Sequence, residues 1–324
     1  MAVPDFVRYG VGMAIATAFA LAYILAPIYI FAVLGLFAMQ PKSMSTYFFA
    51  APLLISAILP PIKAKSLLHS YWVKCILDYF DYEEVFEVDD DTLLKMIEDR
   101  KKKVGGGCGS FIFAGQPHGV LSFGGICAGI NADSRFNDIA TAAAGAVMVT
   151  PVVKHVIGLF ELVDASAKSL KKRLWKGGMA GTTVLYPGGI AELFMCSDNE
   201  EVLYLQERKG FIKLALREGA DVVPLYFIGN TASLSIPKVP FLETLSRKYQ
   251  VSITIFWGRW GLPIPRPDKI IYVRGTPLGL PFIPEPTDAD VEKWHSKYVS
   301  EVVRIFEKYK GKSPQYKNRK LTVK

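Results

Sequence analysis

The stretch that decides the fold is Phe111-Ile-Phe-Ala-Gly-Gln-Pro-His-Gly-Val-Leu-Ser122. An apolar run rich in strand-forming residues ends at Gly115, and small and apolar residues suited to a helix follow Gly119. We interpret this pattern as a buried strand that delivers His118 onto a sharp turn at the mouth of an α/β sheet. Ligands gather at the carboxyl ends of strands in such sheets, so His118 is a candidate functional residue.

The turn carries two residues with special backbone properties. Pro117 fixes its own φ, and Gly119 lets the backbone pass close to a substrate. The alternative interpretation is a turn that contains an incidental histidine.

The composition of the chain indicates contact with lipid. Hydrophobic residues make up 51% of the 324 residues and the mean hydropathy is +0.24, both high for a soluble protein. The net charge of +8 fits nucleic acid or anionic lipid as a partner. We favour lipid over nucleic acid, because the sequence has an apolar N-terminus and neither zinc-ligand spacing nor an RNP-like aromatic strand.

The cysteines and histidines do not form a recognisable metal or disulfide pattern. Cys75, Cys108, Cys127 and Cys196 lie far apart without a C-x-x-C motif, which is typical of a reducing, cytosol-facing protein. The four histidines are scattered, so we expect neither a metal site nor a bound cofactor.

Two uncharged apolar segments, residues 9–39 and 43–62, begin the chain and are separated by Lys42. A bilayer core needs about 20 apolar residues per helix, and a signal peptide has a shorter apolar region. Two arrangements stay open: two short spanning helices in a hairpin, or one span followed by a membrane-embedded segment. A buried pair of helices in a soluble protein is a third alternative. We expect the pair Pro60-Pro61 to end the second helix.

The residues that follow place the rest of the chain in the cytosol. Lys63, Lys65 and Lys74 come directly after the apolar segments, and positive residues favour the cytoplasmic side. The aromatic and basic residues 65–82 indicate either an interfacial helix or core packing. We therefore expect a membrane anchor of one or two transmembrane helices over 1–65, and a cytosol-facing catalytic domain with a basic C-terminal tail over 66–324.

Strand and helix patterns alternate through this domain, which predicts an α/β fold with a mostly parallel sheet flanked by helices. Residues 139–149 form an alanine-rich element that Thr150-Pro151 ends or kinks, and 156–163 fit a strand or a short helix. The tail from 311 is expected to be loose. The predicted strands are 111–115, 181–187, 221–228, 251–257 and 270–274, and the predicted helices are 89–103, 122–130, 166–176, 207–217, 242–249 and 286–310.

Three loops that follow predicted strands carry polar groups: residues 116–119, 187–192 and 228–231. In a parallel sheet these loops meet at one edge, where His118 and Glu192 can act as a base and its orienting or substrate-binding carboxylate. No G-x-S-x-G motif is present, which favours direct transfer over a covalent intermediate. The alternatives are a helix N-terminal acid or a surface salt bridge for Glu192, and a turn residue for Asn230.

Several ordered motifs together resemble the type 2 diacylglycerol acyltransferase family, which includes monoacylglycerol and wax-ester acyltransferases. The resemblance covers roughly residues 45–310. The family's His-Pro-His-Gly block matches 116–119 at three of four positions. Its other blocks match Gly188-Gly189-Ile-Ala-Glu192 after Tyr186-Pro187, Arg208-Lys209-Gly210-Phe211-Ile-Lys213, Gly258-Arg259-Trp-Gly-Leu-Pro-Ile-Pro265 and Pro286-Thr287.

The resemblance implies an acyl-CoA-dependent acyltransferase of the endoplasmic reticulum, which makes triacylglycerol from acyl-CoA and diacylglycerol and in some members associates with lipid droplets. It makes His118 the catalytic histidine. The chemistry agrees, because a lipid hydroxyl needs a base with a pKa near neutrality to attack a thioester. Backbone N–H groups around Gly119 or Gly188-Gly189 are candidate donors to the oxyanion.

The candidate substrate-binding residues include four cations that suit the phosphates of CoA by charge type, namely Arg208, Lys209, Lys213 and Arg259. A solvated basic face is the alternative for each cation. The full candidate set is Pro117, Gly119, Gly188, Gly189, Arg208, Lys209, Gly210, Phe211, Lys213, Asn230 and Arg259.

Two departures from related enzymes matter. Gln116 replaces the first histidine of the family block, and we count it with His118 and Glu192 among the candidate catalytic residues. A glutamine donates and accepts hydrogen bonds but cannot act as a base. Glycerolipid acyltransferases with a His-x4-Asp motif have an aspartate where Ser122 stands, so we expect Glu192 to orient His118 instead. Monoacylglycerol, a long-chain alcohol and lysophosphatidic acid are alternative acceptors. A non-catalytic lipid-droplet protein is a further alternative, supported only by Gln116, and a homo-oligomer is possible.

Overall fold

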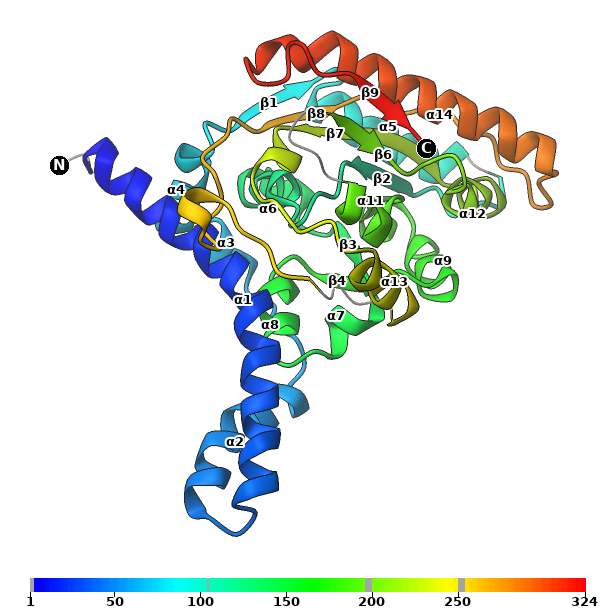
Figure 1. Ribbon diagram of the computed structural model, residues 1–324. Helices are drawn as coiled ribbons and strands as arrows, with labels where there is room; N and C mark the ends of the chain where they lie inside the picture. The colour runs from blue at the N-terminus through cyan, green and yellow to red at the C-terminus, as the bar shows by residue number, and fades with distance from the viewer. Residues whose placement is uncertain (1–2, 104, 196–199, 250–253) are drawn as a thin grey trace.

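The computed structural model describes residues 3–103, 105–195, 200–249 and 254–324. Its main sheet has seven strands in the order β1-β8-β7-β2-β5-β3-β4 (Figure 1). All neighbouring pairs are parallel except β7 and β8. The strands are β1 (Glu83–Phe86), β2 (Phe111–Gln116), β3 (Ala140–Ala143), β4 (Leu162–Asp164), β5 (Thr183–Leu185), β7 (Asp221–Ile228) and β8 (Ile271–Arg274). The predicted mostly parallel α/β fold is confirmed.

The centre of the sheet is formed by β2 and β7, whose residues are all buried. Strands covered on both faces read as continuous apolar runs, which is why the sequence identifies these two most clearly. Side chains of α9 (Ala167–Leu174), α12 (Gly210–Glu218) and α14 (Asp288–Tyr309) fill the core on one face. Side chains of α5 (Asp90–Lys103) and α6 (Phe123–Asn131) pack on the other face.

The remaining helices and 3₁₀ turns connect these layers or begin the chain. They are α1 (Asp5–Met39), α2 (Met44–Ile58), α3 (Lys65–Leu68), α4 (Tyr71–Tyr79), α7 (Gly145–Val149), α8 (Val153–Gly158), α10 (Gly178–Gly181), α11 (Gly189–Met195), α13 (Pro240–Tyr249), η1 (Ser134–Phe136), η2 (Asn230–Ala232), η3 (Arg259–Gly261) and η4 (Lys310–Lys312). A second sheet pairs β6 (Glu201–Leu203) with β9 (Leu321–Val323).

The longest helix after α1 is α14, and its start follows from its sequence. Asp290 N–H donates to the Thr287 hydroxyl at 3.1 Å, and Thr287 N–H donates to the Asp290 carboxylate at 3.0 Å. This capping box satisfies two N–H groups that the helix itself cannot pair. The face carrying Val291, Tyr298 and Val302 is buried on the sheet.

The second half of α1 and all of α2 form an apolar hairpin that projects from the domain (Figure 1). With 35 residues, α1 is about 52 Å long, whereas the 15 residues of α2 cover about 22 Å. Among the described residues, α1 is the one helix long and apolar enough to cross a membrane. Its exposed side chains and those of α2 include Leu25, Ile28, Phe31, Leu34, Met39, Met44, Phe48, Leu54 and Ile58.

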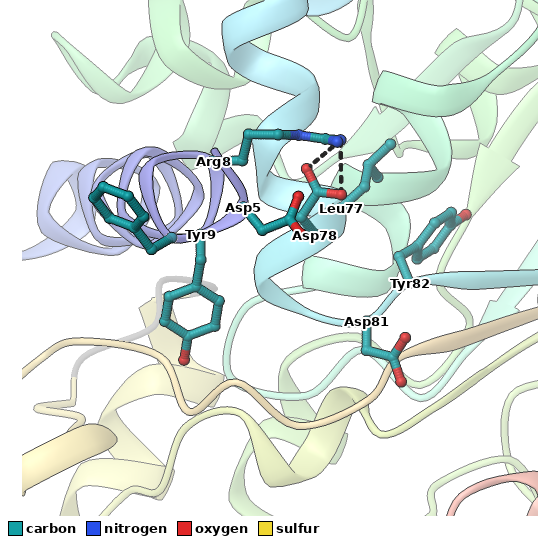
Figure 2. A pocket seen from close by; sticks show the side chains of 8 residues that line it. Asp5, Arg8, Tyr9, Leu77, Asp78, Asp81 and Tyr82 are labelled. Carbon is teal, nitrogen blue, oxygen red and sulfur yellow. Dashed lines mark hydrogen bonds and ion pairs between the residues drawn. The ribbon is translucent and has the colours of Figure 1, made fainter. Parts of the chain in front are cut away.

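The first half of α1 packs against α4 and is part of the folded domain. A guanidinium nitrogen of Arg8 lies 2.8 Å and 2.7 Å from the two carboxylate oxygens of Asp78 (Figure 2). Further along, a Cβ added at Gly12 would lie 2.1 Å from the carbonyl oxygen of Cys75. The predicted anchor segment 1–65 therefore contributes the first half of α1 to the domain.

The C-terminal tail corrects the expectation of a loose segment. Its strand β9 pairs with β6, Tyr316 is completely buried, and an Arg319 guanidinium nitrogen lies 3.6 Å from a carboxylate oxygen of Glu201. The prediction was wrong because a basic composition was taken as a sign of solvation, and the partner strand lies more than a hundred residues earlier.

Several element boundaries also differ from the predictions. The segment 139–149 is a strand followed by a short helix, and 156–163 contains the end of α8 and the first two residues of β4. The helix predicted from 207 begins at Gly210. Residues 251–253 of the predicted strand 251–257 lie outside the described part of the chain, and Trp257 forms an isolated bridge with Ser235. The short strands β1 and β6 had no strand prediction.

Candidate active site

The three polar loops meet at one edge of the sheet, as the sequence predicts. β2 lies between β5 and β7 and is parallel to both, so the segments after these strands come together. Gly119 has a φ of +62°, and a Cβ at this position would lie 2.7 Å from the side-chain nitrogen of Asn230. The turn after β2 therefore needs glycine both for its backbone conformation and for its contact with the next loop.

Asn230 fixes the backbone of the histidine turn. Its side-chain nitrogen donates to the carbonyl oxygens of Pro117 at 3.1 Å and His118 at 2.9 Å, and its side-chain oxygen accepts from the N–H of Gly124 at 3.0 Å. The side chain is 1% exposed. Asn230 therefore positions His118 by binding both the turn and the start of α6.

Glu192, in α11, also holds the backbone of His118. Its Oε2 accepts from the N–H of His118 at 2.9 Å, and its Oε1 accepts from the N–H of Tyr204 at 3.3 Å. A Cβ at Gly188 would lie 2.0 Å from the carboxyl carbon of Glu192, so the family's paired glycines make room for this side chain. Burial raises the pKa of Glu192 to about 8, while the two N–H donors favour its charged form.

The imidazole of His118 is oriented by a carbonyl group. Nδ1 lies 2.8 Å from the carbonyl oxygen of Gly119, which can only accept, so Nδ1 carries the proton and Nε2 has the free lone pair. This differs from the expectation that Glu192 orients the ring. Burial lowers the pKa of His118, so the imidazole is neutral at pH 7.

Gln116 lies behind the site and is fully buried. Its amide nitrogen lies 2.7 Å and 3.1 Å from the two carboxylate oxygens of Glu192, and the other amide atom lies 3.4 Å from the hydroxyl of Tyr298. The Tyr298 hydroxyl in turn donates to the carbonyl oxygen of Ala114 at 3.3 Å. Gln116 therefore supports Glu192 and is not among the residues that line the cavity beside His118.

His118 lies in the wall of a large, mostly apolar cavity of about 1730 Å³. One side of the cavity is the sheet, and another is the stretch of α1 between Phe19 and Phe31, beside α7 and α8. Gly188 and Gly189 line it next to the histidine. Its apolar lining includes Phe113, Leu225, Phe227, Ile126, Ile24 and Ile28.

The structure brings one of the four predicted cations to this cavity. Arg208 lines it, with its guanidinium 4.9 Å from the ring centre of Tyr204. Lys209 pairs with Glu292 at 2.5 Å, on the side of α12 that faces α14.

The other two predicted cations also have protein partners. Lys213 lies 3.8 Å from Asp288, and Arg259 donates to the Tyr9 hydroxyl at 3.2 Å. Phe211, another candidate, packs against Tyr298, with ring centres 5.0 Å apart, and Gly210 is the first residue of α12.

Two features of the site were not predicted. Tyr186 packs its ring against His118, with ring centres 5.1 Å apart and planes at 75°. Its signal was present in the strand alternation, which puts Tyr186 on the same face as Val184. The participation of α1 in the cavity wall could not be predicted from the sequence, because the sequence pattern of an apolar helix is the same whether the helix faces lipid or a cavity.

Comparison with known proteins identifies relatives over most of the chain. The profile of the diacylglycerol acyltransferase family matches residues 100–324. Human Diacylglycerol O-acyltransferase 2-like protein 6 is 29% identical over 248 residues, which cover 66% of this chain and 70% of that protein. Diacylglycerol O-acyltransferase 2 of Xenopus tropicalis is 31% identical over 227 residues, which cover 63% of this chain and 62% of that protein.

Among solved structures, the 1-acyl-sn-glycerophosphate (LPA) acyltransferase PlsC from Thermotoga maritima aligns with 87% of this chain and 96% of its own. The TM-score is 0.39 and the identity 13%. The family assignment rests on the sequence, since the matching profile covers well over half of the residues. The chain belongs to the diacylglycerol acyltransferase family.

Proposed function

We propose that the protein is a membrane-bound, acyl-CoA-dependent O-acyltransferase that transfers a fatty acyl group directly to diacylglycerol, with His118 as the general base. Family membership supports the reaction class. The observation that carries the mechanism is the 2.8 Å contact between Nδ1 of His118 and the Gly119 carbonyl oxygen, because it leaves Nε2 as the basic atom in a cavity suited to lipid.

The reaction then proceeds in two steps. Nε2 of His118 removes the proton of the lipid hydroxyl as that oxygen bonds to the thioester carbon, and the carbonyl electron pair moves onto its oxygen. The tetrahedral intermediate collapses, the carbon–sulfur bond breaks, and the leaving thiolate of CoA takes the proton from the imidazolium. Glu192 and Asn230 keep the histidine backbone in place throughout, so little reorganisation accompanies the transfer.

The donors and cations around the cavity suit the acyl donor. The backbone next to the reacting centre belongs to Gly119, Gly188 and Gly189. Their N–H groups are therefore candidates for binding the oxyanion. Arg208 is the cation that we assign to the CoA phosphates, because it lines the cavity. Acyl-CoA is a substrate in this scheme and CoA is released as a product, and the chemistry requires no metal or bound cofactor.

We further propose that the hairpin of α1 and α2 inserts into the endoplasmic reticulum membrane, or into the surface of a lipid droplet, from the cytosolic side. The exposed apolar residues of the hairpin support insertion. The length of α2, about 22 Å, is below the roughly 30 Å of a bilayer core, which favours an embedded segment over a second full span. Because α1 lines the cavity, lipid can enter from the bilayer without crossing water.

The test uses microsomes that express the full chain, labelled acyl-CoA and a panel of acceptors. Labelled triacylglycerol from diacylglycerol, lost in His118→Ala, is the expected result. Product formed only from monoacylglycerol, a long-chain alcohol or lysophosphatidic acid would contradict the proposed acceptor. No product with any acceptor would contradict the enzymatic function.

A further inference from the structure

Tyr186 lies beside the proposed base without an assigned role. It follows β5, lines the cavity, and stacks on Phe227 with ring centres 6.1 Å apart. Its hydroxyl occupies a space that exists because α6 carries Gly125, where a Cβ would lie 1.9 Å from the hydroxyl oxygen. The ring thus reaches across from the sheet to the start of α6 and also packs against His118.

The hydrogen bonds around Tyr186 leave its own proton available. The N–H of Gly125 donates to the Ser122 hydroxyl oxygen at 3.2 Å, and the Ser122 hydroxyl donates to the Tyr186 oxygen at 2.8 Å. Tyr186 therefore accepts a hydrogen bond and still has one proton to donate. Among the described residues, the Tyr186 hydroxyl has one assigned hydrogen bond, in which Ser122 is the donor and the tyrosine oxygen the acceptor.

A tyrosine with an unused donor in an apolar cavity is suited to bind a developing negative charge. Burial raises the pKa of Tyr186 to about 12, so the hydroxyl keeps its proton at every pH at which the enzyme would work. Donors that are fixed before the reaction and aimed at the developing oxyanion lower the barrier more than donors that must reorient.

We propose that the Tyr186 hydroxyl donates a hydrogen bond to the thioester carbonyl oxygen and stabilises the oxyanion of the acyl transfer. This inference rests on the proposed function. As the lipid oxygen bonds to the carbonyl carbon, the π electron pair moves onto the oxygen that Tyr186 contacts. When the carbon–sulfur bond breaks, the pair returns to form the ester carbonyl, and the tyrosine proton stays on the tyrosine.

The geometry allows Tyr186 and His118 to serve the same carbonyl group. Their ring centres are 5.1 Å apart and their planes are nearly perpendicular. With this arrangement, the hydroxyl of the lipid acceptor can lie within about 3 Å of Nε2. The oxygen of the thioester carbonyl that it attacks can at the same time lie within about 3 Å of the tyrosine hydroxyl. Ser122 acts as a positioning residue, since its hydroxyl donates to the Tyr186 oxygen and accepts from the N–H of Gly125.

The experiment compares full-length wild-type protein with Tyr186→Phe, which removes the hydroxyl and keeps the ring. We expect kcat with acyl-CoA and diacylglycerol to fall on the order of 100-fold, with KM for acyl-CoA changed less than about threefold, because the bond forms mainly in the transition state. A thioether analogue of acyl-CoA, which has no carbonyl oxygen, should bind both proteins equally. Full activity of Tyr186→Phe would overturn the proposal.

The matched control is Tyr82→Phe. Tyr82 also donates a hydroxyl hydrogen bond, to Glu84 at 2.9 Å, but is not among the residues that line the cavity. Its kcat should stay within about twofold of wild type. A wild-type protein that is inactive with every acceptor would contradict the proposed function itself, whereas an active wild type with an equally active Tyr186→Phe contradicts the tyrosine role alone.

A second measurement applies if Tyr186→Phe does not fold. A fluorinated tyrosine at position 186 keeps the ring and hydroxyl but ionises at a lower pH. Because the ionised form cannot donate, the proposal predicts a new loss of kcat on the alkaline side, which is absent from wild type and from the same replacement at Tyr82. An unchanged pH profile would contradict the proposal.

Discussion

The main-chain N–H of His118 lies 2.9 Å from Oε2 of Glu192, so this carboxylate holds the backbone of the histidine. The ring is oriented separately, by the Gly119 carbonyl. The two blocks that the family resemblance brings together, the histidine turn and the Gly-Gly-x-x-Glu loop, are thus joined by a hydrogen bond that fixes the position of the proposed base.

Glu192→Gln should strongly reduce transfer without preventing membrane insertion. An amide keeps one acceptor but places an NH₂ group against N–H donors, which leaves buried polar groups unpaired. We expect kcat to fall on the order of 100-fold, measured with labelled acyl-CoA in microsomes. The exposed Glu98→Gln in α5 is the matched control and should behave as wild type. A fully active Glu192→Gln would contradict the positioning role.

The pH dependence of kcat/KM should follow the proton of His118. The reaction needs the neutral imidazole, and burial lowers its pKa from 6.5, so the acid limb of the profile should have its midpoint below pH 6.5. Tyr186, with a pKa of about 12, does not titrate in this range. An acid limb with its midpoint at pH 7 or above would contradict a buried, neutral base.

The C-terminal tail should be needed for both stability and activity. Arg319 is the cation beside Glu201, a buried carboxylate. Glu201 accepts a hydrogen bond from the Thr231 hydroxyl at 2.8 Å. Thr231 adjoins Asn230, whose side chain binds the histidine turn. Arg319→Met leaves that carboxylate without this cation, which typically costs about 3–5 kcal/mol for a buried pair. We expect a lower melting temperature and lower kcat.

Two comparisons make this prediction specific. Lys317→Met removes a positive charge from an exposed position in the same tail and should leave both quantities unchanged. Adding Glu201→Gln to Arg319→Met should restore part of the stability, because it removes the uncompensated charge. A stable, active Arg319→Met would show that the tail does not support the site.

The wall that α1 contributes should affect acyl-chain selectivity. Ile24 lines the cavity, while its neighbour Leu25 is 53% exposed on the outside of the helix. Ile24→Trp fills part of the cavity and should shift the preference toward shorter acyl-CoA chains, measured by competition between chain lengths. Leu25→Trp should leave the preference unchanged. Equal effects of the two variants would indicate that α1 acts only as an anchor.

The sequence predicted the parts of this fold that local patterns determine. β2 and β7 are continuous apolar runs, and α14 begins with a complete capping box, so each element is visible within its own residues. The meeting of the three loops also followed from the sequence, because parallel strands end at one edge. The three- and four-residue strands β1, β6 and β9 could not be predicted, since they depend on partners far away in the chain.

The site was predicted as a set of residues but not as a set of contacts. Sequence patterns identify His118 and Glu192, yet only three-dimensional contacts show that the carboxylate binds a main-chain N–H. For the cations, charge type alone cannot tell Arg208, which lines the cavity, from Lys209, which pairs with Glu292. Contacts also account for the residue at position 116, where this chain differs from the family, because the buried amide of Gln116 donates to the carboxylate of Glu192.

The most direct test of the central claim is the rate of labelled triacylglycerol formation by purified full-length protein in lipid nanodiscs, with saturating acyl-CoA and diacylglycerol. If His118 is the base, His118→Ala should lose about 10²–10⁴-fold in kcat while binding the thioether analogue as wild type does. A His118→Ala protein that forms triacylglycerol at a rate close to wild type would contradict the account.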